Sequence, residues 1–194
     1  MTRIIAGAKK GHRLRTPAHS ATRPTSDRVR EAAFSLIADW AGTAGEPAEE
    51  MLAELSFLDL YAGSGAVAIE AASRGAVPVL AVESDPATAK LARGNALDTG
   101  LAVTVLAATA ERTVAVPATK SYDVIWADPP YALANDRLTA VLQSALDNGW
   151  LVADGLLVLE RASRDAAPLW PAQMTESWQR RYGETTLYFA TRGG

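Results

Sequence analysis

The sequence has 194 residues, of which 48% are hydrophobic and 21% charged, as expected for a folded domain rather than a disordered chain. It has no cysteine and only two histidines, which excludes disulfides and thiolate metal sites and disfavours a histidine-based metal centre. No apolar run approaches the roughly 20 residues that cross a membrane, and the N-terminal stretch, which lacks an apolar core, is not expected to be a secretory signal. We therefore expect a monomeric cytoplasmic protein without a metal or a membrane partner.

The net charge of −3 is unevenly distributed along the chain. Residues 1–30 contain eight Lys and Arg residues against one acidic residue, whereas the remainder contains 11 basic and 21 acidic residues. A basic segment on an acidic body is typical of proteins that contact phosphate backbones. Ile4, Ile5 and Leu14 alternate with these charges, which favours a small β-hairpin over a solvated tail. The candidate RNA-binding residues are Arg3, Lys9, Lys10, Arg13, Arg15, Arg23 and Arg28.

We divide the chain into a basic N-terminal extension, residues 1–24, and a single domain, residues 25–194. The domain is expected to begin with a helix near Thr25–Asp27, because Thr25 or Ser26 can cap it. Its apolar residues from Val29 to Trp40 recur at helical spacing, and Arg28 and Arg30 lie off that stripe. A loop and a short helical piece at residues 49–55 follow.

From Phe57 onward, short apolar strands alternate with helices. Strands are expected at residues 57–61, 79–82, 103–106, 122–126 and 156–159, and helices at 66–73, 85–98 and 136–147. The chain closes with a hairpin, residues 177–181 and 185–190, around Gly183. This alternation predicts a mostly parallel sheet with helices on both faces and an antiparallel element at the end.

Special residues follow the first two strands of this predicted sheet. Asp59 is followed by the turn Gly63-Ser64-Gly65, and Glu83 ends the next strand. Ligands of open α/β sheets bind beyond the carboxyl ends of the strands, where glycine allows close backbone approach and an acid can accept both ribose hydroxyls. A third glycine is missing, since Ala68 takes its place, which counts against a dinucleotide. The pattern favours a nucleoside ligand.

The sequence Asp128-Pro129-Pro130-Tyr131 ends the fourth strand. Two prolines cannot continue a sheet ladder, so they fix a rigid turn that holds the Asp128 carboxylate and the Pro129 carbonyl as two converging acceptors. An aryl amine has two hydrogens to donate to such a pair, and accepting them frees its lone pair for attack on a sulfonium methyl group. Tyr131 offers a flat face to a flipped base.

The set Asp59, Gly63, Gly65, Glu83 and Asp128–Tyr131 resembles the class I, Rossmann-like S-adenosylmethionine methyltransferases. The N-terminal runs 3–7, 11–14 and 23–31 resemble those of the RsmD family, the 16S ribosomal RNA guanine-N2 methyltransferases. This resemblance covers essentially the whole chain. It implies an α/β fold with a mostly parallel seven-stranded sheet. It also implies methyl transfer from S-adenosyl-L-methionine to the N2 amine of a guanine in the small subunit or its assembly intermediate.

The resemblance assigns roles to individual residues. Residues 63–65 would cradle the methionine part of the cofactor, Glu83 the ribose, Asp128 the target amine, and Tyr131 the base. Relatives often bind the adenine through Asp or Asn where this chain has Thr109-Ala110. The expected catalytic residues are Asp128, Pro129 and Tyr131. The expected cofactor-binding residues are Asp59, Ala62, Gly63, Ser64, Gly65, Glu83, Ser84, Thr109, Ala110 and Asp128.

Several alternatives remain open at this point. The Asp128–Tyr131 motif suits the N6 amine of adenine in DNA or RNA equally well. A protein glutamine is a less suitable target, because relatives that modify it carry Asn at position 128. A non-catalytic RNA-binding assembly factor is disfavoured by the intact motifs. A nicotinamide-dependent oxidoreductase is disfavoured by the incomplete glycine pattern.

Overall fold

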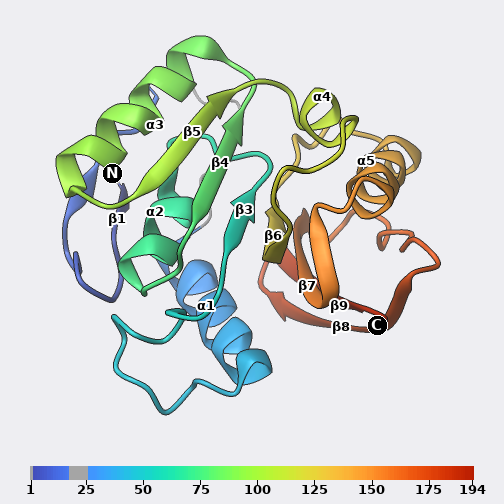
Figure 1. Cartoon of the computed structure of the whole chain (residues 1–194), viewed down its shortest axis with the longest axis horizontal. Coiled ribbons are helices and arrows are strands. Elements are labelled where there is room, and N and C mark those ends of the chain that lie inside the picture. The colour runs from blue at the N-terminus through green and yellow to red at the C-terminus, as the bar shows by residue number, and fades with distance from the viewer. Residues whose placement is uncertain (1, 18–25) are drawn as a thin grey trace.

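A computed structural model describes residues 2–17 and 26–194 of the chain. Strands β1 (Thr2–Arg3) and β2 (Arg13–Leu14) form a small antiparallel sheet. The main sheet is made of seven strands, and five helices surround it (Figure 1). Its strands are β3 (Phe57–Asp59), β4 (Val79–Glu83), β5 (Val103–Ala107), β6 (Tyr122–Ala127), β7 (Leu151–Ala162), β8 (Met174–Tyr182) and β9 (Thr185–Arg192). The helices are α1 (Asp27–Ala41), α2 (Ala66–Ser73), α3 (Pro86–Thr99), α4 (Ala110–Val114) and α5 (Asn135–Asp147).

The strand order of the main sheet is β5-β4-β3-β6-β7-β9-β8. The first five strands in this order, β5, β4, β3, β6 and β7, pair in parallel, and β9 and β8 add an antiparallel hairpin at the edge. The chain runs outward from β3 to β5 and then returns to β6 on the other side of β3, so the order reverses between β3 and β6. A crevice opens at such a reversal, beyond the carboxyl ends of the strands. The predicted fold class is confirmed.

Helices cover both faces of the main sheet. Residues of α1 and α2 pack with Phe57, Val124 and Phe189 on one face, and α3 contributes Ala96 beside α2. Residues of α4 and α5 pack with Ile125 and other strand residues on the opposite face. Because successive side chains of a strand point to opposite faces, the continuous apolar runs of the central strands fill both layers.

Two local predictions were wrong, and one short helix was not predicted. Residues 49–55 form successive hydrogen-bonded turns instead of a helix, with bonds such as Ala53 N–H to Glu50 O (3.0 Å). Helix α4 was not predicted, because five residues are too few to show a helical period. Arg30 does not lie off the buried side of α1: it is 1% exposed. It can be buried because its guanidinium donates to Thr2 Oγ1, the Arg3 carbonyl and Asp27 Oδ1.

The N-terminal hairpin is docked on α2 through a buried carboxylate. Glu70 accepts hydrogen bonds from the backbone N–H groups of Ile5 (2.7 Å) and Ala6 (3.0 Å), and it pairs with the Arg74 guanidinium (2.9 Å). Gly7 lies so close to α2 that a Cβ there would come within 1.8 Å of the Ser73 carbonyl oxygen. The predicted hairpin is therefore confirmed, and residues 2–17 are part of the folded body.

Candidate functional site

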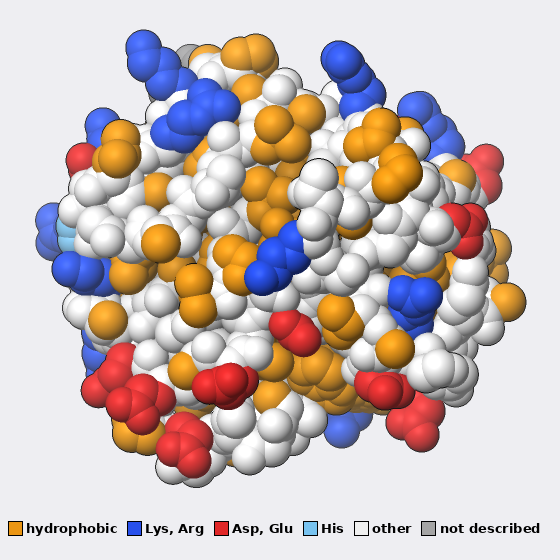
Figure 2. All heavy atoms as spheres, in the orientation of Figure 1, with side chains coloured by type: hydrophobic (Ala, Val, Ile, Leu, Met, Phe, Trp, Pro, Cys, Tyr) orange, Lys and Arg blue, Asp and Glu red, His pale blue; other side chains and the backbone are white. Residues whose placement is uncertain are grey.

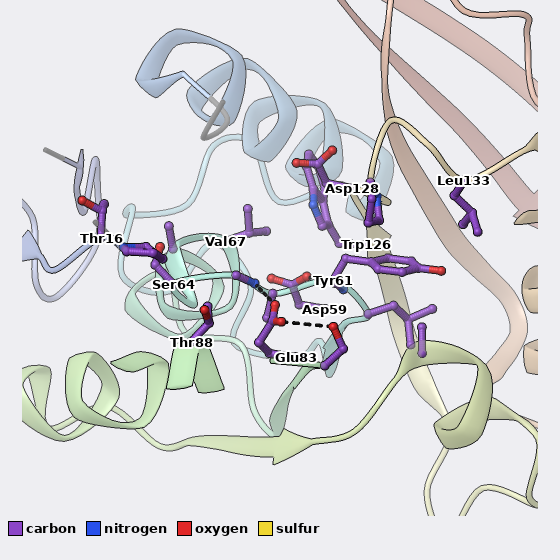
Figure 3. Close-up of a pocket in the computed structure, with 18 of the residues that line it drawn as sticks. Thr16, Asp59, Tyr61, Ser64, Val67, Glu83, Thr88, Trp126, Asp128 and Leu133 are labelled. Carbon is purple, nitrogen blue, oxygen red and sulfur yellow. Dashed lines mark hydrogen bonds between the residues drawn. The ribbon is translucent and has the colours of Figure 1, made fainter. Parts of the chain in front are cut away.

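A cavity of about 370 Å³ lies at the carboxyl ends of β3, β4 and β6, where the strand order reverses. We call it the first cavity. Figure 3 shows Asp59, Glu83 and Asp128 placed around this space by three different strands. The structure thus brings together most of the residues predicted to bind a cofactor. Those that line the first cavity are Asp59, Ala62, Gly63, Ser64, Glu83, Ser84, Ala110 and Asp128.

The turn after β3 and the end of β4 are joined by hydrogen bonds. Gly63 adopts φ +53°, a conformation that favours glycine, and its N–H donates to Glu83 Oε2 at 2.9 Å. The other oxygen of Glu83 accepts from the Asp85 N–H (2.8 Å) and the Ser84 hydroxyl (3.3 Å). These bonds fix the orientation of the Glu83 carboxylate in the wall of the cavity (Figure 3).

Asp59 is a buried carboxyl group with unused bonding capacity. Its Oδ1 accepts a long bond from the Tyr61 N–H (3.4 Å), and Oδ2 is buried without a hydrogen-bond partner among the described residues. Burial, and secondarily the charge of Glu83, raises the pKa of Asp59 to about 7. A buried acceptor without a partner is costly, so this group suits a ligand that brings a cationic N–H donor.

Asp128 stands at the other side of the first cavity, at the start of the rigid turn after β6. Burial, followed by the negative charges of Glu160 and Asp59, raises the pKa of Asp128 well above its usual range, and the charge of Arg161 opposes this. Pro129 is buried and Pro130 lines the cavity. An acid with a raised pKa is a stronger proton acceptor than an ordinary carboxylate, which suits chemistry on an amine.

Tyr131 lines a separate cavity of about 460 Å³, which we call the second cavity. The walls of the second cavity come from the start of α1, the end of β7 and the β8–β9 hairpin. Tyr131 is 52% exposed, so its ring is open to a partner from solvent. The turn of residues 128–131 therefore contributes Asp128 to one cavity and Tyr131 to the other.

Three predicted residues take supporting positions. The Thr109 hydroxyl accepts from the Arg112 N–H (3.2 Å) and so caps α4, while its neighbour Ala110 lines the first cavity. Gly65 adopts φ +81° before α2, where an added Cβ would meet Ile69 at 3.3 Å and Ala92 at 3.4 Å. Pro129 is not among the residues found to line either cavity, and it lies within the turn between Asp128 and Pro130, which line the first cavity.

Sequence reasoning missed residues that the N-terminal part of the chain brings to the first cavity. Thr16 and Pro17, which follow the hairpin, and Arg30 of α1 line it, although they are distant in sequence from the strand ends. Asn95 of α3 holds this segment: its side chain accepts from the Arg15 N–H and donates to the carbonyls of Arg15 and Ser64, at 2.9–3.0 Å. No local motif marks Asn95, because all of its partners lie at least 31 residues away.

The predicted RNA-binding cations are mostly exposed. Lys9, Lys10, Arg13 and Arg28 are exposed, and Arg3 and Arg15 are exposed while pairing with Asp27 and Asp98. Arg23 lies outside the described residues. Figure 2 shows Lys and Arg side chains along the upper and left edges of one face, and Asp and Glu side chains along the lower edge. Surface ion pairs are weak, so phosphates can compete for these cations.

In the described part of the chain, residues 2–17 and 26–194, neither a membrane span nor a metal-binding cluster is found. No helix in this part is long and apolar enough to span a membrane. No group of three or more His, Cys, Asp or Glu side chains there could hold a metal ion.

Comparison with known proteins places this site in a family. The family model described as "Conserved hypothetical protein 95" matches residues 2–191. The chain is 31% identical to ribosomal RNA small subunit methyltransferase D of Escherichia coli, over 88% of this chain and 79% of that protein. It is also 31% identical to the putative rRNA methyltransferase YlbH of Bacillus subtilis, over 99% and 100% of the two chains.

The fold agrees with these matches. A solved structure of a putative methyltransferase from Escherichia coli superposes with a TM-score of 0.82 at 26% identity, covering 98% of this chain and 97% of that one. The family match spans nearly the whole chain and includes both cavities and the N-terminal hairpin. The chain therefore belongs to the Conserved hypothetical protein 95 family, the RsmD family of class I methyltransferases.

Proposed function

We propose that the protein transfers a methyl group from S-adenosyl-L-methionine to the exocyclic N2 amine of a guanine in 16S ribosomal RNA. One observation carries the proposal: the Asp128–Tyr131 turn separates a nucleoside-sized cavity from a second, open cavity. Family membership favours this function over the adenine-N6 and assembly-factor alternatives. The intact set of carboxylates in the first cavity supports a catalyst rather than a binding protein.

The first cavity fits the cofactor. The buried Asp59 oxygen without a partner suits the cationic amino group of its methionine part, and the oriented Glu83 carboxylate suits the two ribose hydroxyls. Residues 62–65 leave room for close approach because they carry small side chains. Ser84 and Ala110 complete the wall, with Gly65 and Thr109 supporting it from behind. The bound cofactor supplies an electrophilic methyl group on a sulfonium.

Asp128 then acts on the amine of the target base. It accepts a hydrogen bond from one N–H, and the Pro129 carbonyl accepts from the other, so the nitrogen lone pair turns toward the methyl group. The cofactor would supply the methyl group to this nitrogen, and Asp128, whose pKa is raised, would receive the proton that the amine loses. Tyr131 stacks on the flipped base. Positioning and electrostatics thus provide most of the rate enhancement.

We further propose that residues 1–24 are an RNA-binding extension and residues 25–194 the catalytic domain. The cations Arg3, Lys9, Lys10, Arg13, Arg15, Arg23 and Arg28 would contact phosphates. The substrate would be the small subunit or an assembly intermediate of it, and the enzyme would work as a cytoplasmic monomer. Support comes from the exposed, docked hairpin, which holds its cations on a fixed surface beside the first cavity.

The test is methyl transfer from labelled S-adenosyl-L-methionine to small subunits from cells that lack this enzyme, followed by nucleoside analysis. The proposal predicts label in N2-methylguanosine of the RNA. Label on adenine or on protein would contradict the assigned substrate and leave the cofactor assignment standing. No label at all, with cofactor bound, would favour the assembly-factor alternative.

A further inference from the structure

The second cavity lies next to the first, because the turn of residues 128–131 and the start of α1 contribute residues to both. Asp128 and Pro130 line the first cavity, and Tyr131 lines the second. The volume of about 460 Å³ lies within the range of small-ligand sites, and its walls come from four separate elements. A base that stacks on Tyr131 with its amine at Asp128 must therefore place its remaining edge against the walls of the second cavity.

Glu160 is a largely buried acidic residue in the wall of the second cavity. Glu160 and Ala162 of β7 both line the cavity, whereas Arg161 between them lies on the opposite face, where it donates to the Leu133 carbonyl (3.4 Å). Glu160 is only 7% exposed, and it pairs in the sheet with Leu187 of β9. Its position is thus fixed by the sheet rather than by a loop.

Glu160 also lies close to the reacting end of the site. Ala127 of β6 pairs with Leu159 of β7, so the residues that follow them, Asp128 and Glu160, come from adjacent positions of neighbouring strands. The negative charge of Glu160 is accordingly one of the causes that raise the pKa values of both Asp128 and Tyr131. The site thus holds two carboxylates near the face of Tyr131. Two adjacent carboxylates suit a ligand edge that carries two adjacent N–H donors.

We propose that Glu160 is a specificity-determining residue, which accepts a hydrogen bond from the N1–H of the target guanine in the second cavity. This inference rests on the proposed function. Guanine has N1–H directly beside its N2 amine, whereas adenine has a ring-nitrogen acceptor beside its N6 amine. A carboxylate attracts the first edge and repels the second. Glu160 thereby selects the base, which the Asp128–Tyr131 motif alone leaves open.

The test compares two bases in reconstituted small subunits, guanine and 2,6-diaminopurine at the methylated position. The analogue keeps the N2 amine and replaces N1–H by an acceptor. The unaltered enzyme is expected to prefer guanine in kcat/KM by about tenfold to hundredfold. Glu160→Gln can donate its amide N–H to the analogue, so the preference should collapse or reverse. A merely structural role would lower transfer to both bases equally.

The matched control is Glu184→Gln, which removes the same charge from an exposed wall residue of the second cavity and should keep the preference for guanine. If Glu160→Gln fails to fold, Glu160→Asp replaces it: this variant should lose kcat/KM yet still prefer guanine. An unchanged preference in Glu160→Gln, or a lost one in Glu160→Asp, overturns the inference alone. Absence of N2-methylguanosine with the unaltered enzyme overturns the proposed function, and this inference with it.

Discussion

The first and second cavities share the turn of residues 128–131 but are built in different ways. The first lies at the ends of adjacent parallel strands, so its carboxylates directly follow apolar runs in the sequence. The second is assembled from the start of α1, the end of β7 and the antiparallel hairpin, and its α1 residues lie more than 130 positions before those of β7 and the hairpin. The first cavity thus follows from the parallel α/β fold itself, whereas the second depends on how α1, β7 and the hairpin are placed next to one another.

This difference separates the tasks of the two cavities. The first carries buried or oriented carboxylates that suit a cationic nucleoside cofactor. The second is bordered by the exposed ring of Tyr131 and by the start of helix α1, which carries the exposed Arg28. Substitutions should therefore affect one ligand without the other, unless they touch the shared turn or a residue that bridges the two regions.

The largest effect is expected at the shared turn. Asp128→Ala should lower kcat by about 1000-fold, because it removes an acceptor that is used mainly in the transition state. Cofactor affinity should stay nearly unchanged. Labelled methyl transfer and calorimetric titration with S-adenosylhomocysteine measure the two quantities. Unchanged turnover in this variant would contradict the mechanism.

The next effect concerns RNA alone. Neutralising Lys9, Lys10, Arg13 and Arg15 together should weaken subunit binding by about tenfold to hundredfold, and should flatten the plot of log affinity against log salt by up to about 3. Cofactor affinity should not change by more than a small factor. The control is Lys120→Gln, an exposed lysine in the loop ahead of β6 and outside the N-terminal hairpin. An unaltered salt slope would exclude the hairpin as the phosphate contact.

Of the two ligands, Asp59→Asn should affect binding of the cofactor and not of the RNA. Affinity for the cofactor should fall by about tenfold at pH 8, since a charge-assisted bond to the amino group is lost. Because the pKa of Asp59 is about 7, cofactor affinity of the unaltered protein should rise as the pH passes from 6 to 8. The variant should lack this rise. Calorimetric titration with the cofactor at these pH values measures the difference. If the affinity of the unaltered protein and of the variant depends on pH in the same way, Asp59 does not bind the cofactor.

The same substitution should change stability in the opposite direction. With a folded pKa of about 7 and an unfolded value near 4, Asp59 favours the folded state below about pH 4 and loses that contribution as the pH rises to about 7. Asp59→Asn should therefore stabilise the cofactor-free protein by about 1–3 kcal/mol at pH 8, and by much less at pH 5. Urea unfolding at both pH values measures this difference.

The smallest effect is expected where the hairpin meets the first cavity. Asn95→Ala removes three hydrogen bonds, to Arg15 and Ser64, and should weaken cofactor binding and raise the KM for subunits by about threefold to tenfold each. The control is Asn148→Ala at the far end of α5, which also removes side-chain bonds. If both variants lose only stability, Asn95 does not connect the N-terminal hairpin to the first cavity.

Much of the fold and of the first cavity could be predicted from the sequence. Strand ends such as Asp59 and Glu83 are marked by apolar runs, and caps such as Asp85 and glycines such as Gly100 mark helix boundaries. These signals are local, because they reflect backbone geometry and capping within a few residues. The same locality explains why the hairpin of residues 2–17 was predicted.

The remaining features depend on contacts between distant residues. Arg30 and Glu70 can be buried because each lies close to the other and bonds to the backbone of residues 3–6. These residues are too far apart in the sequence for a local pattern to reveal the contact. Thr109 looks like a ligand-binding residue until the short helix that it caps is seen. Glu160 reads as the polar end of a buried strand, and only the hairpin packed beside it makes it a cavity residue.

The central claim is that the cofactor occupies the first cavity, the target guanine the second, and the two meet at Asp128. A crystal structure with a bisubstrate ligand tests it most directly, with guanine joined through N2 to the adenosine half of the cofactor by a short linker. The account predicts the adenosine ribose at Glu83, the N2 atom at Asp128 and the guanine between Tyr131 and Glu160. Guanine bound outside the second cavity, with the adenosine half in place, would contradict it.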